Sequence, residues 1–350
     1  MTNEKQFPIK EWWDVEYHPK DIPRKEYNEG DVVAIFDADT VVFPVSSACQ
    51  EKTVIVTNIK GQQKEFKNKT KFKGWCKEKG KDFEDYTISE KVVAEPVEYC
   101  LGTLKRAIKN LKESVGATHI ELYLGGSGNF RLELPTPIKY KDNRKDMSKP
   151  IHLEACQEYL MKHMSAIKVK GLECDDFVNI RTIEVNKMGE VKGVLVTTDK
   201  DALATFSDEI YVYKANTLYH LTEPLGELWL DASGKVKGKG LKWQTTQALI
   251  TGDATDNYLP RLHFNKTYGE KSWYKDVKDM DNLQEFLKFS IDKFRSLVGD
   301  VVEFKDWTGK EQKMSYLELA DLYFSAAYMK TSNDDQRTFQ SLLKEYGVEY

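Results

Sequence analysis

Short apolar runs alternate with longer segments of helical periodicity over the first two thirds of the chain. Residues 32–36 (VVAIF) form a continuous apolar run, which is typical of a strand buried on both faces. Helices are expected at 150–165, from about Glu173, and between Pro96 and Gly116, where apolar residues recur with helical spacing. Further strands are expected at 119–124, 167–169, 193–197, 209–213 and 217–220. This alternation predicts an α/β fold with a mostly parallel sheet flanked by helices.

The alternating pattern is interrupted after the first predicted strand and stops beyond about residue 242. Beyond about residue 242 the strand pattern mostly stops, and helices are expected at 242–251, 282–297 and 315–331. Residues 53–57 with Lys60 and Gly61 suggest a small hairpin, and the Lys- and Glu-rich residues 66–92 suggest a surface insertion. We therefore predict an N-terminal arm (1–30), an α/β catalytic domain (31–260) and a C-terminal helical module (261–350).

Acidic residues recur where the predicted strands end, which is where open α/β sheets bind their ligands. A lone Asp at such a place is usually a turn or capping residue, but four groups are difficult to explain in that way. The groups are Asp37 and Asp39; Glu173, Asp175 and Asp176; Asp199 and Asp201; and Asp253 and Asp256. Carboxylates gathered this closely need cations, and oxygen ligands without His or Cys select Mg²⁺ or Mn²⁺. Two such ions, ~4 Å apart, would clamp a phosphate for in-line attack.

Basic residues lie between the second predicted strand and the helix at 150–165. Asn129-Phe130-Arg131 is followed by a basic stretch at 139–145, KYKDNRK. Arg and Lys neutralise phosphates, and Tyr140 offers a ring on which an end base could stack. An isolated stretch of this kind is usually a solvated loop. Its place between two acidic groups favours a phosphate-binding role.

A second interpretation fits some of the same residues. Asp37-Ala38-Asp39-Thr40 after a strand matches the nucleophile motif of haloacid dehalogenase-type phosphatases, with residues 252–256 as a late acidic motif. In that reading Asp37 attacks phosphate and Asp39 is the acid/base. The phosphatase reading gives no role to Glu173, Asp175 or the basic stretch.

Taken together, the ordered motifs resemble the 5′-nuclease superfamily, and most closely its phage 5′→3′ exonuclease branch. The motifs are IFDADTVVF (35–43), NFRLELPTPIKYKDNRK (129–145), GLECDDF (171–177), TTDKDALA (197–204) and TGDATDNYLP (251–260). Each motif alone is weak, but the ordered set is specific. The resemblance implies a 5′-nuclease-like α/β fold with a C-terminal module of helix-three-turn-helix type. It also implies hydrolysis of DNA, or of RNA in RNA–DNA hybrids, from or near a 5′ end.

The resemblance also implies residue roles. The first Mg²⁺ would be held by Asp37, Glu173 and Asp175, with Asp176 alongside, and the second by Asp199, Asp201, Asp253 and Asp256. Lys141 and Arg144 would contact the scissile phosphate, and Tyr140 would stack on the terminal base. Arg131, Lys139 and Lys145 would bind DNA, as would Gly269 and Lys271 in a glycine turn similar to the one that in this family often holds K⁺.

One departure from the family pattern concerns the segment before Phe130. Many members carry an Asp shortly before the Phe-Arg pair, whereas this chain has Gly125-Gly126-Ser127-Gly128. Asp39 could compensate for the missing acid. The departure otherwise leaves open a catalytically silent relative that only binds DNA.

Composition adds little to this picture. The chain has 350 residues, 40% hydrophobic and 31% charged, as in ordinary globular proteins, and no apolar run long enough to predict a membrane helix. Its five scattered cysteines lack a CxxC motif and indicate reduced thiols, so we expect a cytoplasmic protein, in the host cytoplasm if a phage encodes it. The net charge of −4 does not itself indicate a nucleic-acid partner, so the local pattern has to decide.

Overall fold

A seven-stranded sheet lies at the centre of the computed structural model, which describes residues 15–145, 147–206 and 208–350. The strand order is β1–β7–β6–β2–β8–β9–β10, and every pair is parallel except β9–β10. The strands are β1 (Glu16–Tyr17), β2 (Val32–Asp37), β6 (His119–Gly125), β7 (Ile167–Val169), β8 (Lys192–Val196), β9 (Ile210–Lys214) and β10 (Thr217–Leu221). The predicted mostly parallel sheet is confirmed. Part of the predicted arm, residues 1–14, lies outside the described residues.

Helices cover both faces of this sheet, which explains why β2 is apolar from Val32 to Phe36. Val33 and Ile35 point into one core, shared with α5 (Cys174–Asn186) and with the C-terminal helices. Ala34 and Phe36 point into a second core, shared with α1 (Asp39–Ala48), α3 (Val97–Ser114) and α4 (Leu153–Met164).

The position of β2 determines where a ligand can bind. The chain leaves β2 through α1 and returns to β6 on one side, whereas β8 pairs with the other side of β2. The strand order therefore reverses at β2, and in open α/β sheets such a reversal opens a crevice at the carboxyl ends of the strands. Asp37 is the last residue of β2 and lies at that point.

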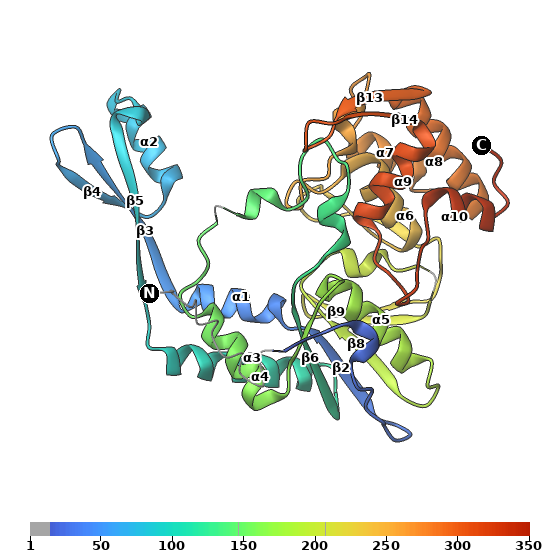
Figure 1. Cartoon of the computed structure of the whole chain (residues 1–350), viewed down its shortest axis with the longest axis horizontal. Helices are drawn as coiled ribbons and strands as arrows, with labels where there is room; N and C mark the ends of the chain where they lie inside the picture. Colours follow the sequence, from blue (N-terminus) through green and yellow to red (C-terminus); the bar gives the residue numbers. More distant parts are fainter. Residues whose placement is uncertain (1–14, 146, 207) are drawn as a thin grey trace, which may run out of the picture.

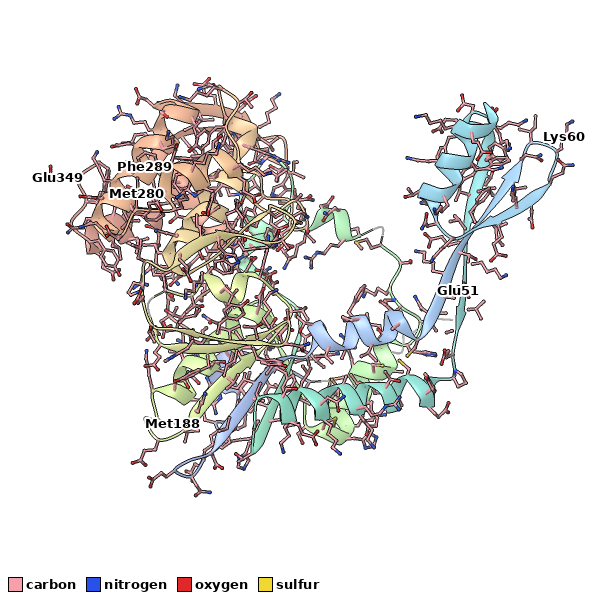
Figure 2. All side chains as sticks on the ribbon, turned by 180° about the vertical axis from the view of Figure 1, so that it is seen from behind. Glu51, Lys60, Met188, Met280, Phe289 and Glu349 are labelled. Carbon is pink, nitrogen blue, oxygen red and sulfur yellow. The ribbon has the colours of Figure 1, made fainter. Side chains whose placement is uncertain are left out.

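Residues 50–94 form a projecting lobe. It contains the antiparallel strands β3 (Gln50–Asn58), β4 (Gln63–Phe66) and β5 (Tyr86–Ala94), and the helix α2 (Lys69–Lys79). Figure 1 shows the lobe at a distance from the C-terminal helices, connected to the sheet through α1 and α3. Glu51 lies near its base and Lys60 at its tip (Figure 2). The hairpin predicted from residues 53–61 is confirmed as the β3–β4 pair.

The C-terminal part is mainly helical, as predicted, with two added hairpins. Its helices are α6 (Gly240–Thr245), a π-helical segment (Thr246–Thr251), α7 (Glu270–Val277), α8 (Leu283–Val298), α9 (Tyr316–Ala327) and α10 (Phe339–Glu345). The hairpins pair β11 (Glu227–Leu230) with β12 (Val236–Lys239), and β13 (Val301–Lys305) with β14 (Glu311–Ser315). Short 3₁₀ turns occupy 19–21, 83–85, 130–133, 142–144, 201–204 and 260–263. None of the helices in the described part of the chain has the length and apolar character needed to cross a membrane.

Candidate active site

A pocket of about 420 Å³ opens at the carboxyl ends of β2, β6 and β8. It brings together six acidic residues and two basic residues from five separate segments. The acids are Asp37, Asp39, Glu173, Asp175, Asp199 and Asp256, and the bases are Lys141 and Arg144. The loop after β6 contributes Gly125, Gly126 and Asn129. Most of the residues that the sequence predicted for one site therefore line one cavity.

Two carboxylates of this region each have one buried oxygen without a partner among the described residues. Within the part of the chain that the structure describes, Asp37 Oδ1 and Asp201 Oδ1 have no hydrogen-bond partner. Burial, with the nearby charges of Asp39 and Asp199, raises the pKa of Asp37 to about 7. Burial and Asp199 raise the pKa of Asp201 to about 8. Unpaired buried carboxyl oxygens beside other acids are the environment that a hard divalent cation stabilises.

Glu173 lies where three positively polarised groups meet. It is the residue just before α5, and it accepts hydrogen bonds from Tyr140 Oη at 3.1 Å and Arg131 Nη1 at 3.2 Å. Lys141 Nζ forms a third contact, an ion pair. Burial raises the pKa of Glu173, but Arg131 and Lys141 more than offset that effect and hold the pKa below its usual range. Glu173 is thus kept ionised.

Asp175, in the first turn of α5, has the opposite balance. Its burial, together with the charges of Glu173 and Asp176, holds its pKa well above the usual range. Keeping this carboxyl group ionised would require a cation nearby.

Asp256 binds the basic stretch from the other side. Arg144 Nη2 forms an ion pair with its Oδ1, and Tyr140 donates to its Oδ2 at 3.0 Å. Lys141 Nζ lies 3.6 Å from the same Oδ2, and the Lys141 backbone N–H donates to the Asp256 carbonyl at 3.0 Å. Burial raises the pKa of Asp256, and Lys141 and Arg144 offset this only partly. The loop carrying both cations is therefore anchored to Asp256 through main chain and side chains.

The cations of the site are all paired with its acids in this structure. Lys141 binds Glu173, Arg144 binds Asp256, and Lys200 Nζ lies 2.7 Å from Asp253 Oδ2. No three Asp, Glu, His or Cys side chains among the described residues stand in an arrangement that could hold a metal ion. The donor set itself fits Mg²⁺ or Mn²⁺, because it offers only oxygen ligands and includes the two unsatisfied carboxyl oxygens.

Two predicted site residues lie in the protein interior instead. Arg131 is 2% exposed and Asp176 is fully buried, and they form a two-pronged pair with N–O distances of 2.6 and 3.0 Å. Arg131 also donates to the carbonyls of Ala326 and Tyr328, and the Lys330 N–H donates to Asp176. Arg131 therefore offers no surface to DNA, and both oxygens of Asp176 are already hydrogen-bonded. We withdraw both from the candidate site and assign them to joining α5 to the end of α9.

Tyr140 also differs from its predicted role. Its side chain is 3% exposed, and its ring is stacked on Tyr258 at a centroid distance of 6.3 Å. Its hydroxyl links Glu173 and Asp256. A ring buried in this way cannot stack on a nucleotide base, so Tyr140 is a positioning residue that holds two acids of the site together.

The remaining predicted residues lie around the pocket or farther away. Asp199 accepts the Asp201 N–H at 2.9 Å, which fixes the turn after β8. Lys139 Nζ lies 4.0 Å from the Trp307 ring centre, and the exposed Lys145 pairs with Asp142.

The backbone at the predicted glycine turn does not require a glycine at position 269 in this structure. Gly269 precedes α7 with an extended φ of −141°, and a Cβ there would meet open space. Residues 252–269 separate the π-helical segment from α7. Roles for Gly269 and the exposed Lys271 in DNA binding, and for a K⁺ ion, stay predictions.

Three residues that line the site or contact its acids were not predicted from the sequence. Lys200 lies inside the motif TTDKDALA, so its position between two acids could have indicated an ion pair. Asn129 lines the pocket, and Gln157 reaches it from α4 by donating to Asp39 at 2.8 Å. Nothing in the sequence around Gln157 indicates that contact, because it depends on how α4 packs against α1.

The geometry does not support the phosphatase interpretation. That mechanism needs Asp39 as a free acid/base, but both of its oxygens accept hydrogen bonds, one from the Gly125 N–H at 2.7 Å and one from Gln157 at 2.8 Å.

No protein-family model matches the chain, and no curated protein matches it. Solved structures do match. One is a mutant of T5 5′-exonuclease, 14% identical, with 86% of this chain and 88% of that chain covered and a TM-score of 0.41. Another is a mutant bacteriophage T5 flap endonuclease in a pseudo-enzyme–product complex with DNA and metal ions, 14% identical, with coverages of 90% and 97% and a TM-score of 0.47. A third T5 structure, co-crystallised with metal ions, is 15% identical, with coverages of 86% and 89% and a TM-score of 0.39. The chain is thus similar to solved phage nucleases, the branch that its motifs resemble, but at these identities and TM-scores its function has to be inferred from the site itself.

Proposed function

We propose that this chain is a metal-dependent 5′-nuclease that hydrolyses phosphodiester bonds of DNA, or of RNA paired with DNA, from or near a 5′ end. The observation that carries the proposal is the pocket at the end of β2, where acids and cations from five segments converge. Carboxylates alone would suit many metal sites. Carboxylates with Lys141 and Arg144 on the same wall suit a phosphate held against metal ions.

The acids divide into two sets by their position. Asp37, Glu173 and Asp175 would hold one divalent ion, and Asp199, Asp201, Asp253 and Asp256 would contribute to a second. When bound, Mg²⁺ or Mn²⁺ would supply an activated water and neutralise charge on the phosphate and leaving oxygen. Asp176, assigned to this site from the sequence, is left out because Arg131 takes up its carboxylate.

Lys141 and Arg144 hold the substrate phosphate in this proposal. Both side chains are now paired with carboxylates of the pocket, so each can exchange that carboxylate for a phosphate oxygen when the acids bind metal. Arg144 can do so with two N–H groups, and Lys141 acts as a point charge. Tyr140 keeps Glu173 and Asp256 in place through its hydroxyl while the cations move.

The test is cleavage of one duplex labelled at its 5′ end and of the same duplex labelled at its 3′ end, with Mg²⁺ and with chelator. Early release of the 5′ label only, and only with metal, is the expected result. Asp201→Asn should abolish it and leave DNA binding largely intact, whereas the exposed Asp292→Asn, a matched change on α8, should have no effect.

Other outcomes would contradict the proposal in distinguishable ways. Turnover of p-nitrophenyl phosphate without release of either label would indicate a phosphatase. Tight DNA binding without metal-dependent release would indicate a silent relative. Early release of the 3′ label would contradict the proposed polarity.

A further inference from the structure

The projecting lobe carries a concentrated positive charge in a chain that is acidic as a whole. Residues 60–81 contain nine lysines and two glutamates, a net charge of +7, and the whole lobe, with eleven lysines and seven acids, has a net charge of +4, whereas the full chain has a net charge of −4. All nine lysines are exposed. Within this fully described segment only Lys79 has a salt bridge, to Glu78, and the other glutamate, Glu65, is paired with Lys91 of β5. The other eight lysines of this segment form no salt bridge with an acid of the described residues.

The lobe holds these lysines on a folded support. Its core consists of the buried Val56, Phe72 and Cys76, with five aromatic or aliphatic side chains packed around them, namely Phe66, Trp75, Phe83, Tyr86 and Ile88. Lys69, Lys73 and Lys77 are four residues apart on α2, so they form a row along one side of the helix with a spacing of roughly 6 Å. A row of fixed cations suits a polyanion with regularly spaced charges.

The position of the lobe relative to the site sets what it can reach. α1 begins at Asp39 beside the pocket and ends at Ala48, and β3 leads from there to the tip. At about 3.4 Å per residue, the nine residues of β3 extend roughly 30 Å, which is the length of about nine base pairs. Figures 1 and 2 both show the lobe separated from the C-terminal helices, and the nine lysines of residues 60–81 are exposed.

We propose that the lobe of residues 50–94 is a second nucleic-acid-binding surface, which holds the phosphate backbone of the substrate away from the bond that is cut. The choice of nucleic acid as the polyanion rests on the proposed function. The charge of the lobe, its exposure and its distance from the pocket are observations that do not depend on the proposed function. The lobe raises the affinity for long substrates only, because a short substrate fills the pocket without reaching the lobe.

The test measures binding with chelator present, so that it does not depend on cleavage. A lobe variant, Lys69→Ala with Lys73→Ala and Lys77→Ala, removes the row of three charges and keeps good helix formers in α2. The matched control, Lys105→Ala with Arg106→Ala and Lys109→Ala, removes three exposed charges from α3. Fluorescence anisotropy would give the Kd for a duplex of about 40 base pairs and for a hairpin duplex of about 6 base pairs over a series of salt concentrations.

The lobe variant should bind the long duplex roughly tenfold or more weakly, with a log–log salt slope reduced by about 2 to 3, since each lost phosphate contact removes about 0.9. The short duplex and the control variant should give wild-type values. A variant with Lys60, Lys67 and Lys81 changed to Gln, all outside α2, should repeat the effect if the first variant loses its thermal stability.

Each contrary result has one meaning. Wild-type binding of the long duplex by both lobe variants overturns the inference, as does an equal loss on both duplexes or in the control. Loss of long-duplex binding by the lobe variants, in a protein that cuts neither labelled duplex, supports the lobe and contradicts the nuclease. A wild-type protein that binds no nucleic acid at low salt, but binds anionic vesicles or an acidic peptide, overturns both proposals.

Discussion

The carboxylate of Asp39 accepts a hydrogen bond from the backbone N–H of Gly125 at 2.7 Å. This contact joins the start of α1 to the end of β6. A Cβ added to Gly125 would lie 3.1 Å from Asp39 Oδ2, so the space beside this glycine is already filled by an acid. Gln157 takes the other oxygen of Asp39. Asp39, which could have compensated for the acid missing before the Phe-Arg pair, thus uses both oxygens to hold the end of β6 and α4 in place.

We therefore predict different effects for the two acids of the DAD sequence. Asp39→Asn keeps an oxygen for the Gly125 N–H, and the Gln157 amide can turn to match it, so cleavage should fall only by about threefold. Asp37→Asn removes a proposed metal ligand and should lower the rate roughly 100-fold or more. Single-turnover cleavage with saturating Mg²⁺ would separate them. Equal, large losses would show that Asp39 also binds metal.

The basic stretch allows a comparison between neighbouring cations. Arg144→Ala and Lys141→Met should each lower the single-turnover rate by roughly 100-fold, because each removes a cation that stabilises charge on the phosphate. Lys145→Ala is the matched control. Lys145 is exposed and pairs only with Asp142 in the described structure, so its loss should change the rate little. An effect of Lys145→Ala as large as that of Arg144→Ala would mean that the stretch acts only through its total charge.

Arg131 should behave as a structural residue. Arg131→Ala leaves the buried Asp176 without its partner, so the free energy of unfolding should fall by about 3–5 kcal/mol in urea denaturation. A double variant, Arg131→Met with Asp176→Leu, removes both charges and should recover much of that loss. If Arg131 instead contacted DNA, the single variant would keep its stability and lose affinity.

Glycine substitutions distinguish a required turn from a permissive one. Gly252 has φ +61° and ψ −166°, and a Cβ there would lie 2.0 Å from the Tyr258 carbonyl oxygen. Gly252→Ala should therefore destabilise the protein by at least about 1–3 kcal/mol and reduce cleavage, since this turn carries Asp253 and Asp256. Gly269→Ala, with extended backbone and open space, should change the melting temperature little. A large effect of Gly269→Ala on DNA affinity alone would support the predicted glycine contact.

A partly buried histidine should make stability depend on pH. Burial lowers the pKa of His263 to about 4, while its Nε2 lies 2.9 Å from Tyr323 Oη. Because the folded state favours the neutral ring, the stabilisation is complete above pH 6.5 and is lost as pH falls towards 4. The loss should reach up to roughly 3 kcal/mol. Urea denaturation of the wild type and of His263→Gln between pH 7 and 4 would measure it, since the carboxylates contribute equally to both. Parallel curves would contradict the prediction.

The sequence alone determined the fold class and the order along the chain of the segments that form the site. The run VVAIF is apolar at every position because both faces of β2 are covered, and that pattern is visible without coordinates. Acids that directly follow strands, such as Asp37 and Asp199, could be assigned to one edge because parallel strands end on the same side. The basic stretch 139–145 was visible as a local motif between two acidic groups, and the resemblance to the family singled out Lys141 and Arg144 within it.

Only the tertiary structure decided which charged residues face the pocket. Asp175 and Asp176 are neighbours on α5, yet one lines the pocket and the other is enclosed by Arg131 and the Lys330 N–H, because adjacent helical positions point in different directions. From residue type alone, Arg131 and Tyr140 were expected at the surface, in contact with DNA. They are buried by the end of α9 and by Tyr258, contacts made across 195 and 118 positions of the chain. Local sequence carries no record of such partners, and the projection of the lysine-rich lobe away from the sheet was hidden for the same reason.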